Sequence, residues 1–134
     1  MKDFSIHSAP SGAVYLAVDI GASSGRHIVS YLSEGKLVLR EVYRFHNGVL
    51  EIDKRRYWDV DRLFREILNG LAAAKAAGYA PDYVGIDTWA VDYVLLDGKD
   101  CPIGTPYAYR DDRGAAIKDA SHARMDFPSL YEKT

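Results

Sequence analysis

One carboxylate and a short run of small residues have the composition of a phosphate site. An apolar stretch over 15–18 ends in Asp19, and the loop GASSG follows over 21–25 before Arg26. Glycines let a ligand approach the backbone and allow positive φ angles, and unpaired N–H groups in such a turn form a concavity that binds anions. Because Asp19 would repel a phosphate directly, it suits a divalent cation that bridges the carboxylate to the phosphate.

The same loop is also compatible with a plain hairpin turn between two strands. The next apolar run, over 28–32, has the composition of a strand rather than of the helix that follows a P-loop. Neither the Gly-Lys-Ser/Thr of a P-loop nor the GxGxxG of dinucleotide-binding folds occurs here. The loop therefore leaves two interpretations open, a phosphate site and a simple turn.

Composition narrows the class of protein. The chain has 134 residues, 48% of them hydrophobic, which suits one compact domain with a substantial core. A net charge of −2 gives no indication of a nucleic-acid surface. The single cysteine, Cys101, excludes an internal disulfide and fits a reducing compartment, so we expect a cytoplasmic protein. No apolar run approaches the roughly 18 residues of a membrane span, and residues 1–13, rich in Ser, Pro and Gly, are expected to form a flexible leader.

The apolar pattern predicts the element order βββαβ, an α/β arrangement. Three strands, expected to form an antiparallel meander, are predicted at 15–18, 28–32 and 36–45. A helix is expected from Asp59 or Asp61 to Ala77, with Gly78 just after its end. Periodicity also predicts which side chains of the third strand share one face, and which side chains of the helix form one apolar face. They are Leu37, Leu39, Tyr43 and Phe45 in the strand, and Leu63, Phe64, Ile67, Leu68 and Leu71 in the helix.

A second carboxylate follows the same pattern as Asp19. A strand predicted over 83–87 ends in Asp87, and a further strand is predicted over 91–97. If the first strand and 83–87 lie side by side in parallel, their carboxyl ends meet at the same edge of the sheet. Asp19 and Asp87 would then face one crevice, although either carboxylate could instead cap a turn.

Two polar segments admit both a structural and a functional interpretation. PYAYRDDR over 106–113 combines aromatic rings with paired Arg and Asp, which suits a sugar site as well as a surface ion-pair cluster. The basic run over 54–56 is predicted to be a solvated loop, because runs of charge usually face water. Helices are predicted over 113–123 and from 127 onward.

Five segments together resemble the FGGY carbohydrate kinases, and among them the rhamnulokinases. In the family's order, they are VDIGASSGR (18–26), REVYRFHNG (40–48), WDVD (58–61), VGIDTWAVDYVLLD (84–97) and PYAYRDDR (106–113). The resemblance implies an actin/hexokinase-like (ribonuclease H-like) fold with a mixed sheet flanked by helices. It implies that residues 14–134 are the N-terminal part of the first of two domains. It also implies transfer of the ATP γ-phosphoryl group, with Mg²⁺, to L-rhamnulose to give L-rhamnulose 1-phosphate.

The resemblance assigns roles to individual residues as well. It implies that Asp19 lies near Mg²⁺. The residues implied to contact the ATP phosphates are Gly21, Ala22, Ser23, Ser24, Gly25 and Arg26. Those implied to form the sugar site are Asp87, Thr88, Trp89, Ala90, Tyr109 and Arg110.

The chain departs from the family in two respects. Rhamnulokinases have glycine where this chain has Ala90, so an added methyl group lies in the implied sugar segment. The family is also several times longer, and the resemblance implies that its catalytic base, an aspartate, lies beyond Thr134, as do its adenosine-binding loops. We therefore expect no catalytic residue within this chain and no activity without the missing C-terminal part of the same protein. The alternative is a non-catalytic sugar- or nucleotide-binding module of actin-like fold.

Overall fold

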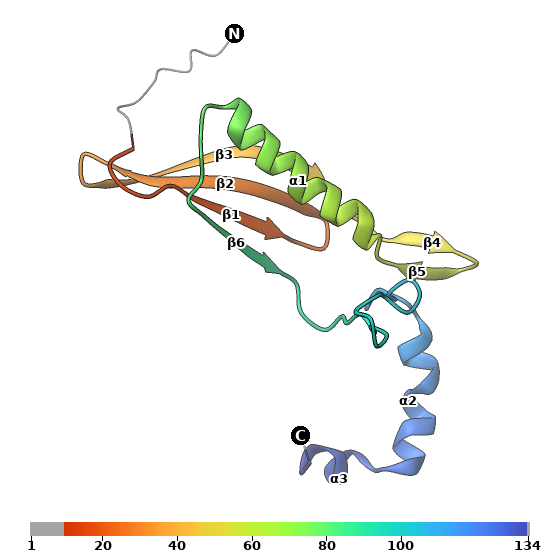
Figure 1. Cartoon of the computed structure of the whole chain (residues 1–134). Coiled ribbons are helices and arrows are strands. Elements are labelled where there is room, and N and C mark those ends of the chain that lie inside the picture. Colours follow the sequence, from red (N-terminus) through yellow and green to blue (C-terminus); the bar gives the residue numbers. More distant parts are fainter. Residues whose placement is uncertain (1–9, 134) are drawn as a thin grey trace. The chain divides into compact units, whose positions relative to one another are not determined.

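A computed structural model describes residues 10–133, which form two compact units. The first unit comprises residues 10–48 and 60–90, and the second comprises 49–59 and 91–133. Figure 1 labels the elements in chain order.

Two of the predictions fall partly outside the described residues. Of the predicted leader, residues 1–9 are not described, and Ser11 donates from its backbone N–H to the carbonyl oxygen of Leu32 at 2.9 Å. Thr134, the last residue of the predicted kinase segment 14–134, also lies outside the described residues. That the catalytic base of the family lies beyond Thr134 stays a prediction, because no part of this structure tests it.

The first unit is built on a four-stranded mixed sheet in the order β3-β2-β1-β6 (Figure 1). Its strands are β1 (Tyr15–Ile20), β2 (Ser24–Ser33), β3 (Lys36–His46) and β6 (Tyr83–Thr88). The first three pair antiparallel, and β6 pairs parallel with β1. The predicted meander and the predicted parallel neighbour of the first strand are both confirmed.

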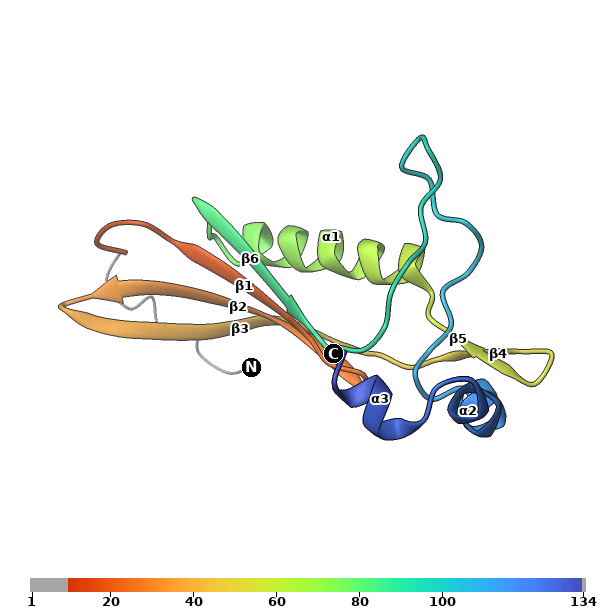
Figure 2. The same ribbon diagram turned by 90° about the horizontal axis from the view of Figure 1, so that it is seen from below.

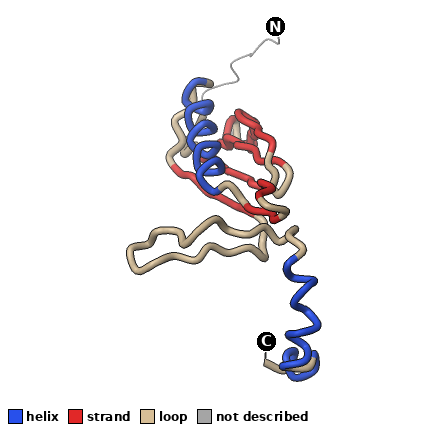
Figure 3. Tube along the Cα trace, turned by 90° about the vertical axis from the view of Figure 1, so that its right-hand side faces the viewer, coloured by secondary structure: helices blue, strands red, loops and turns tan. Residues whose placement is uncertain are grey.

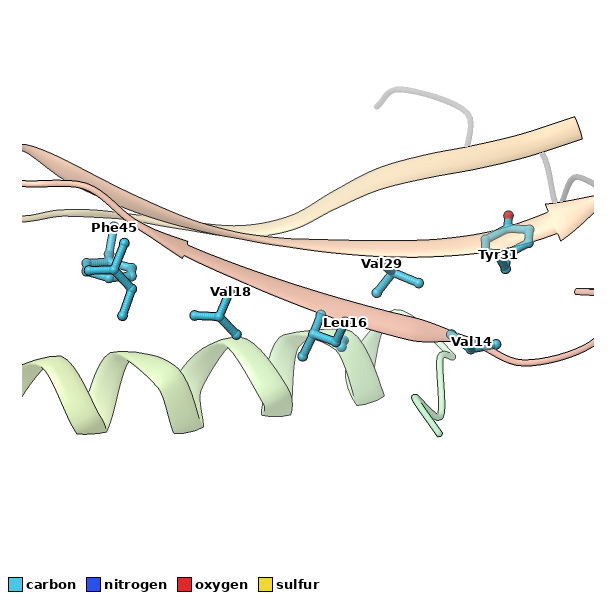
Figure 4. Close-up of a cluster of buried hydrophobic side chains, with 8 residues drawn as sticks. Val14, Leu16, Val18, Val29, Tyr31 and Phe45 are labelled. Carbon is cyan, nitrogen blue, oxygen red and sulfur yellow. The ribbon is translucent and has the colours of Figure 1, made fainter. Parts of the chain in front are cut away.

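Helix α1 (Val60–Ala76) covers one face of this sheet, as Figures 2 and 3 show from two sides. Buried and exposed residues alternate along β1, so one set of its side chains faces the helix and the other faces away. Figure 4 shows part of the core between sheet and helix. The core side chains are Val14, Leu16, Val18, Ile20, Val29, Tyr31, Phe45 and Ala74.

The helix ends at Ala76, one residue before the predicted Ala77, and Gly78 follows its end as predicted. The φ angle of Gly78 is +86°, which glycine adopts without strain. The N–H of Tyr79 donates to the carbonyl of Ala74 and that of Gly78 to Lys75, both at 3.0 Å, which is a Schellman motif. The predicted apolar face was too wide, because three of its five members contact the core while two lie largely in solvent. Leu63, Ile67 and Leu71 pack against the core, whereas Phe64 and Leu68 are 60% and 48% exposed.

The prediction that Leu37, Leu39, Tyr43 and Phe45 share one face of β3 is wrong. The register between β2 and β3 shifts between His27 and Ile28, where a β-bulge adds one residue to β3. Because side chains alternate with period two, the extra residue moves the preceding part of the strand to the opposite face. Leu37 and Leu39 are therefore 66% and 58% exposed, while Phe45, beyond the bulge, is buried.

The second unit contains a hairpin and two helices. Its elements are β4 (Leu50–Ile52), β5 (Arg55–Tyr57), α2 (Arg113–Arg124) and α3 (Phe127–Tyr131). The predicted solvated loop over 54–56 is confirmed for Lys54, which is exposed in the turn between β4 and β5, and is wrong for Arg55 and Arg56, which belong to β5 and are bound by Asp111. The strand predicted over 91–97 is also wrong, because Leu96 makes only an isolated bridge with Pro102. Both predicted helices are confirmed. None of the helices in residues 10–133 combines the length and the apolar composition that a bilayer crossing demands.

Gly70 allows α1 to approach β2 very closely at His27. A Cβ atom on Gly70 would lie 2.2 Å from the imidazole ring. The His27 ring is fully buried and lies edge-on to Tyr43, with 5.5 Å between ring centroids. Neither ring nitrogen has a hydrogen-bond partner among the described residues. Burial lowers the pKa of His27, and this outweighs the Ile67 backbone and the Glu66 carboxylate, which favour the protonated ring.

We predict that Gly25→Ala lowers the free energy of unfolding by about 1–3 kcal/mol, the usual cost of overpacking a core. A Cβ atom on Gly25 would lie 2.2 Å from the Phe45 ring. Gly85→Ala in β6 is the matched control, because nothing lies within 4 Å of its added Cβ. Urea denaturation followed by circular dichroism measures both variants. Phe45→Leu should restore part of the loss, and equal midpoints for the two glycine variants would contradict this packing.

We also predict that acid destabilises the fold through His27. Its pKa in the folded chain lies below the 6.5 of an ordinary histidine, so the unfolded state binds more protons between the two values. The free energy of unfolding should therefore fall as the pH drops through this window, by at most about 1.4 kcal/mol per pH unit. Urea titrations from about pH 5 to 8 measure the slope. His27→Phe should lose this contribution and Gly85→Ala should keep it; an unchanged slope in His27→Phe would refute the assignment.

Candidate functional site

Four charged residues form a row across the sheet, one from each strand. The strand register pairs Asp87 with Asp19, Asp19 with Arg26, and Arg26 with Arg44. Val18 and its alternate neighbours on β1 face α1, so Asp19 lies on the opposite, open face. The parallel pairing thus brings Asp19 and Asp87 to adjacent positions at the carboxyl ends of two strands, as the sequence predicted.

Asp19 and Arg26 form an ion pair at this open face. Arg26 Nε donates to Asp19 Oδ2 at 2.9 Å, and the side chains of Arg26 and Asp19 are 45% and 47% exposed. Such an exposed pair contributes little to stability, about 0–1 kcal/mol. Both charges are therefore accessible to a ligand at small energetic cost.

Arg44 extends the row and was not identified from the sequence. Its Nε donates to Glu41 Oε1 at 2.8 Å, and this contact holds the pKa of Glu41 below its ordinary value. The bulge in β3 brings Arg44 opposite Arg26. Sequence periodicity carries no signal for a bulge, so the neighbour of Arg26 on β3 could not be read from the spacing.

In the loop between β1 and β2, the carbonyl groups of Gly21 and Ser23 accept hydrogen bonds, and two N–H groups have no partner among residues 10–133. The Gly21 N–H donates to the Ser24 carbonyl at 2.9 Å, which closes the turn. Asn47 donates from its side chain to the Gly21 carbonyl at 2.8 Å and from its backbone to the Ser23 carbonyl at 3.0 Å. Within residues 10–133 the N–H groups of Ala22 and Ser23 meet no acceptor in hydrogen-bond geometry. The loop therefore presents donors outward, as an anion site requires.

The loop glycines serve packing rather than an unusual backbone conformation. Neither Gly21 nor Gly25 has a positive φ angle, contrary to the expectation from the sequence. Gly25 makes room for the Phe45 ring, and a Cβ on Gly21 would lie 3.1 Å from the Ser24 carbonyl oxygen. At both positions, neighbouring protein atoms lie too close to leave room for a side chain.

Four of the six predicted sugar-site residues lie at the end of β6 in the first unit. Asp87 and Thr88 are exposed, and Thr88 pairs with Ile20, the last residue of β1. Trp89 is partly buried against the core, which fixes the direction of the chain as it leaves the strand. Ala90 follows and is exposed.

The other two, Tyr109 and Arg110, belong to the second unit. Arg110 Nε donates to the Tyr109 hydroxyl at 3.0 Å, and the Tyr109 ring lies 6.5 Å from that of Trp58. Trp58 is 2% exposed, and its indole N–H donates to Asp92 at 2.6 Å. Tyr109 and Arg110 thus rest on a buried aromatic anchor within their own unit.

Asp111 is the structural centre of the polar segment 106–113. Its side chain is 2% exposed and accepts hydrogen bonds from the backbone N–H groups of Arg56 and Arg113 at 2.9 and 3.0 Å. The Arg56 N–H bond is the largest of the contacts that hold the pKa of Asp111 below its ordinary value, and Arg55 adds an ion pair at 3.4 Å. Around Asp111, the segment therefore forms the ion-pair cluster that was one of its two interpretations.

The donor set in the first unit fits a magnesium ion that is shared with phosphates. No three metal-binding side chains cluster in the part of the chain that the structure describes. Magnesium bound together with a phosphate substrate needs only one or two protein carboxylates, because water and phosphate oxygens complete its shell. Asp19, with Asp87 beside it, meets that requirement.

Comparison with known proteins confirms the resemblance seen in the sequence. No family model matches the chain. The chain is 52% identical over 119 residues to the rhamnulokinase of Halalkalibacterium halodurans, which covers 89% of this chain and 25% of that protein. It is 46% identical over 121 residues to the rhamnulokinase of Bacillus subtilis, covering 90% and 25%. The chain thus resembles rhamnulokinases over most of its length and spans about a quarter of the curated relatives it matches.

Solved structures of sugar kinases share the fold. A gluconate kinase from Lactobacillus acidophilus superposes with a TM-score of 0.68 at 13% identity, covering 91% of this chain and 25% of that one. A xylulose kinase from the same species gives a TM-score of 0.67 at 13% identity, covering 90% and 24%. The predicted α/β fold of the actin/hexokinase type is confirmed.

We predict that Asp111→Ala loosens the attachment of β5 to the start of α2, whereas Asp112→Ala does not. The two carboxylates are neighbours in sequence. The side chain of Asp112, however, is 92% exposed, and its Oδ1 lies 4.0 Å from Arg56 Nη1, which is a long contact for an ion pair. Hydrogen exchange at the Arg56 and Arg113 amides should accelerate by about tenfold or more in Asp111→Ala, because a net hydrogen bond to a charged group is worth about 1.5–3 kcal/mol. Equal protection in both variants would show that Asp111 does not anchor this contact.

Proposed function

We propose that this chain supplies the phosphate loop, a metal ligand and part of the sugar site of an ATP-dependent sugar kinase. One observation carries the proposal: Asp19, a loop with outward N–H groups, and the Asp87–Thr88 tip lie together at one end of a parallel strand pair. The similarity to rhamnulokinases supports the same function.

In this proposal the phosphates of ATP lie against the β1–β2 loop. The N–H groups of Ala22 and Ser23 and the Ser23 and Ser24 hydroxyls donate to phosphate oxygens, and Arg26 adds a positive charge. Asp19 binds Mg²⁺ directly or through water. When bound, ATP supplies the phosphoryl group and Mg²⁺ offsets its charge. The protein's contribution is to hold these groups in fixed positions before the reaction begins.

The sugar is proposed to be L-rhamnulose, which would leave as L-rhamnulose 1-phosphate. Thr88 and Asp87 offer a hydroxyl and a carboxylate to sugar hydroxyl groups, and Trp89 offers an apolar surface held by the core. Ala90 stands where the resemblance implies a glycine, and it adds a methyl group to this surface. The family resemblance also gives a sugar-binding role to Tyr109 and Arg110, which belong to the second unit.

We infer that the chain by itself does not transfer phosphate. Phosphoryl transfer depends on holding two substrates in line within a site closed to water. The resemblance implies that the family's catalytic aspartate lies beyond Thr134, and this chain spans about a quarter of the relatives it matches. We therefore expect activity only when the chain is joined to the C-terminal segment that its relatives have in addition.

The test is an ADP-release assay with Mg·ATP and a panel of ketoses, on this chain and on the same reading frame carried to its stop codon. We expect the longer protein to phosphorylate L-rhamnulose and this chain to show no turnover. In the longer protein, Asp19→Asn should lower kcat/KM by about 100-fold or more, the scale of losing one contact to developing charge. Asp100→Asn, at an exposed turn, is the control.

Two outcomes would contradict the proposal. Ketose-dependent ADP release by this chain, abolished in Asp19→Asn, would overturn its inactivity. If the longer protein turned over no ketose, the kinase assignment would fail. The non-catalytic binding module of actin-like fold would then be the function to pursue.

A further inference from the structure

The phosphate loop is oriented by a residue outside it. We propose that Asn47, just after β3, is a positioning residue that aims the Ala22 N–H of the β1–β2 loop at a bound phosphoryl group. This inference rests on the function proposed above. It concerns a residue that composition and spacing gave no reason to single out, because Asn-Gly is an ordinary turn pair.

The direction of each loop peptide follows from the contacts of Asn47. Its Nδ2 donates to the Gly21 carbonyl at 2.8 Å, and its backbone N–H donates to the Ser23 carbonyl at 3.0 Å. A trans peptide is planar, so its C=O and N–H point in opposite directions. Since the Gly21 carbonyl points to Asn47, the N–H of Ala22 points away from it. The bond to the Ser23 carbonyl likewise sets the peptide between Ser23 and Ser24, which carries the Ser24 N–H.

Asn47 is itself held rigidly. The residue is 1% exposed, and its Oδ1 accepts a hydrogen bond from the Gly48 N–H at 2.9 Å. These two side-chain contacts fix which end of the amide faces Gly21. The carbonyl of the preceding residue, His46, accepts a hydrogen bond from Arg62 of α1. The loop is therefore connected through Asn47 to both β3 and the helix.

Without the Asn47 donor, the Gly21 peptide loses the contact that sets its direction. A carbonyl that turns outward places an oxygen next to the phosphate, where it repels the anion and withdraws the Ala22 N–H. Asn47→Asp keeps the size of the side chain but replaces the donor with an acceptor facing the Gly21 carbonyl. Asn47→Leu removes the donor without adding charge. Both variants should bind the anion at least about tenfold more weakly, the scale of one oriented hydrogen bond.

The binding experiment uses ¹⁵N-labelled chain titrated with inorganic pyrophosphate in the presence of Mg²⁺. The amide resonances of Ala22 and Ser23 report the dissociation constant at the loop. Asn69→Asp is the matched control, because it makes the same chemical change at an exposed position of α1. In the longer protein, Asn47→Leu should raise the KM for ATP about tenfold or more and leave the KM for the sugar unchanged, a separation that general loosening would not produce.

The outcomes separate this inference from the proposed function. If the wild type binds at Ala22 and Ser23 and only the Asn47 variants lose binding, the inference is supported. If the Asn47 variants bind as tightly as the wild type, the inference fails while the phosphate loop stands. If the wild-type loop amides do not respond to pyrophosphate, the phosphate loop itself is wrong and the inference with it.

A measurement on the wild type covers the case in which the Asn47 variants do not fold. The side-chain NH₂ protons of Asn47 should exchange slowly with solvent both in the free chain and with pyrophosphate and Mg²⁺ bound, because the bond to Gly21 persists. Loss of that protection on binding would overturn the proposal, since the anion would then break the contact rather than use it.

Discussion

Parallel strands cannot be joined by a tight turn, so the pairing of β1 with β6 requires the chain to cross over a face of the sheet. Helix α1 lies in that crossover, and its packing uses one set of the alternating side chains of β1 and β2. The other set, which carries Asp19 and Arg26, is left on the open face. A single pairing therefore determines both the position of the core and the face on which the charged row lies.

Glycine allows the core beneath this site to pack tightly. Gly70 brings α1 against the ring of His27, and Gly25 brings β2 against the ring of Phe45. Gly25 is also part of the loop that resembles a phosphate motif. The small residues of that loop thus satisfy two requirements at once, a close-packed interior on one side and exposed backbone donors on the other.

Local patterns predicted the elements that local physics determines. The end of α1 before Gly78, the strands before Asp19 and Asp87, and the helix over 113–123 all follow from residue type and period. What could not be predicted depends on contacts distant in sequence. The bulge in β3 is one such feature, since it reverses the faces of Leu37 and Leu39 without any change in composition.

The candidate site divides in the same way. The loop and its two carboxylates were identifiable from their own residues and from the resemblance. Asn47 and Arg44 were not identifiable, because an asparagine in a turn and an arginine on a strand are common. Their roles depend on tertiary neighbours, which are Gly21 and Ser23 for Asn47 and Arg26 for Arg44. Likewise, Asp111 is a buried anchor for β5, although the composition of its segment, 106–113, suited a sugar-binding site equally well.

The ion pair between Asp19 and Arg26 has a thermodynamic consequence on the proposed assignment. An anion that recruits Arg26 has to compete with Asp19, and a cation that recruits Asp19 has to compete with Arg26. When either ligand binds alone, the protein loses the Asp19–Arg26 ion pair and gains one contact with that ligand. When both bind, the same single ion pair is lost and both side chains gain a contact. Cation and anion therefore raise one another's affinity by the same factor, because a coupling free energy between two ligands is reciprocal. In such a site, cooperativity arises from two side chains on neighbouring strands, with no movement of the sheet.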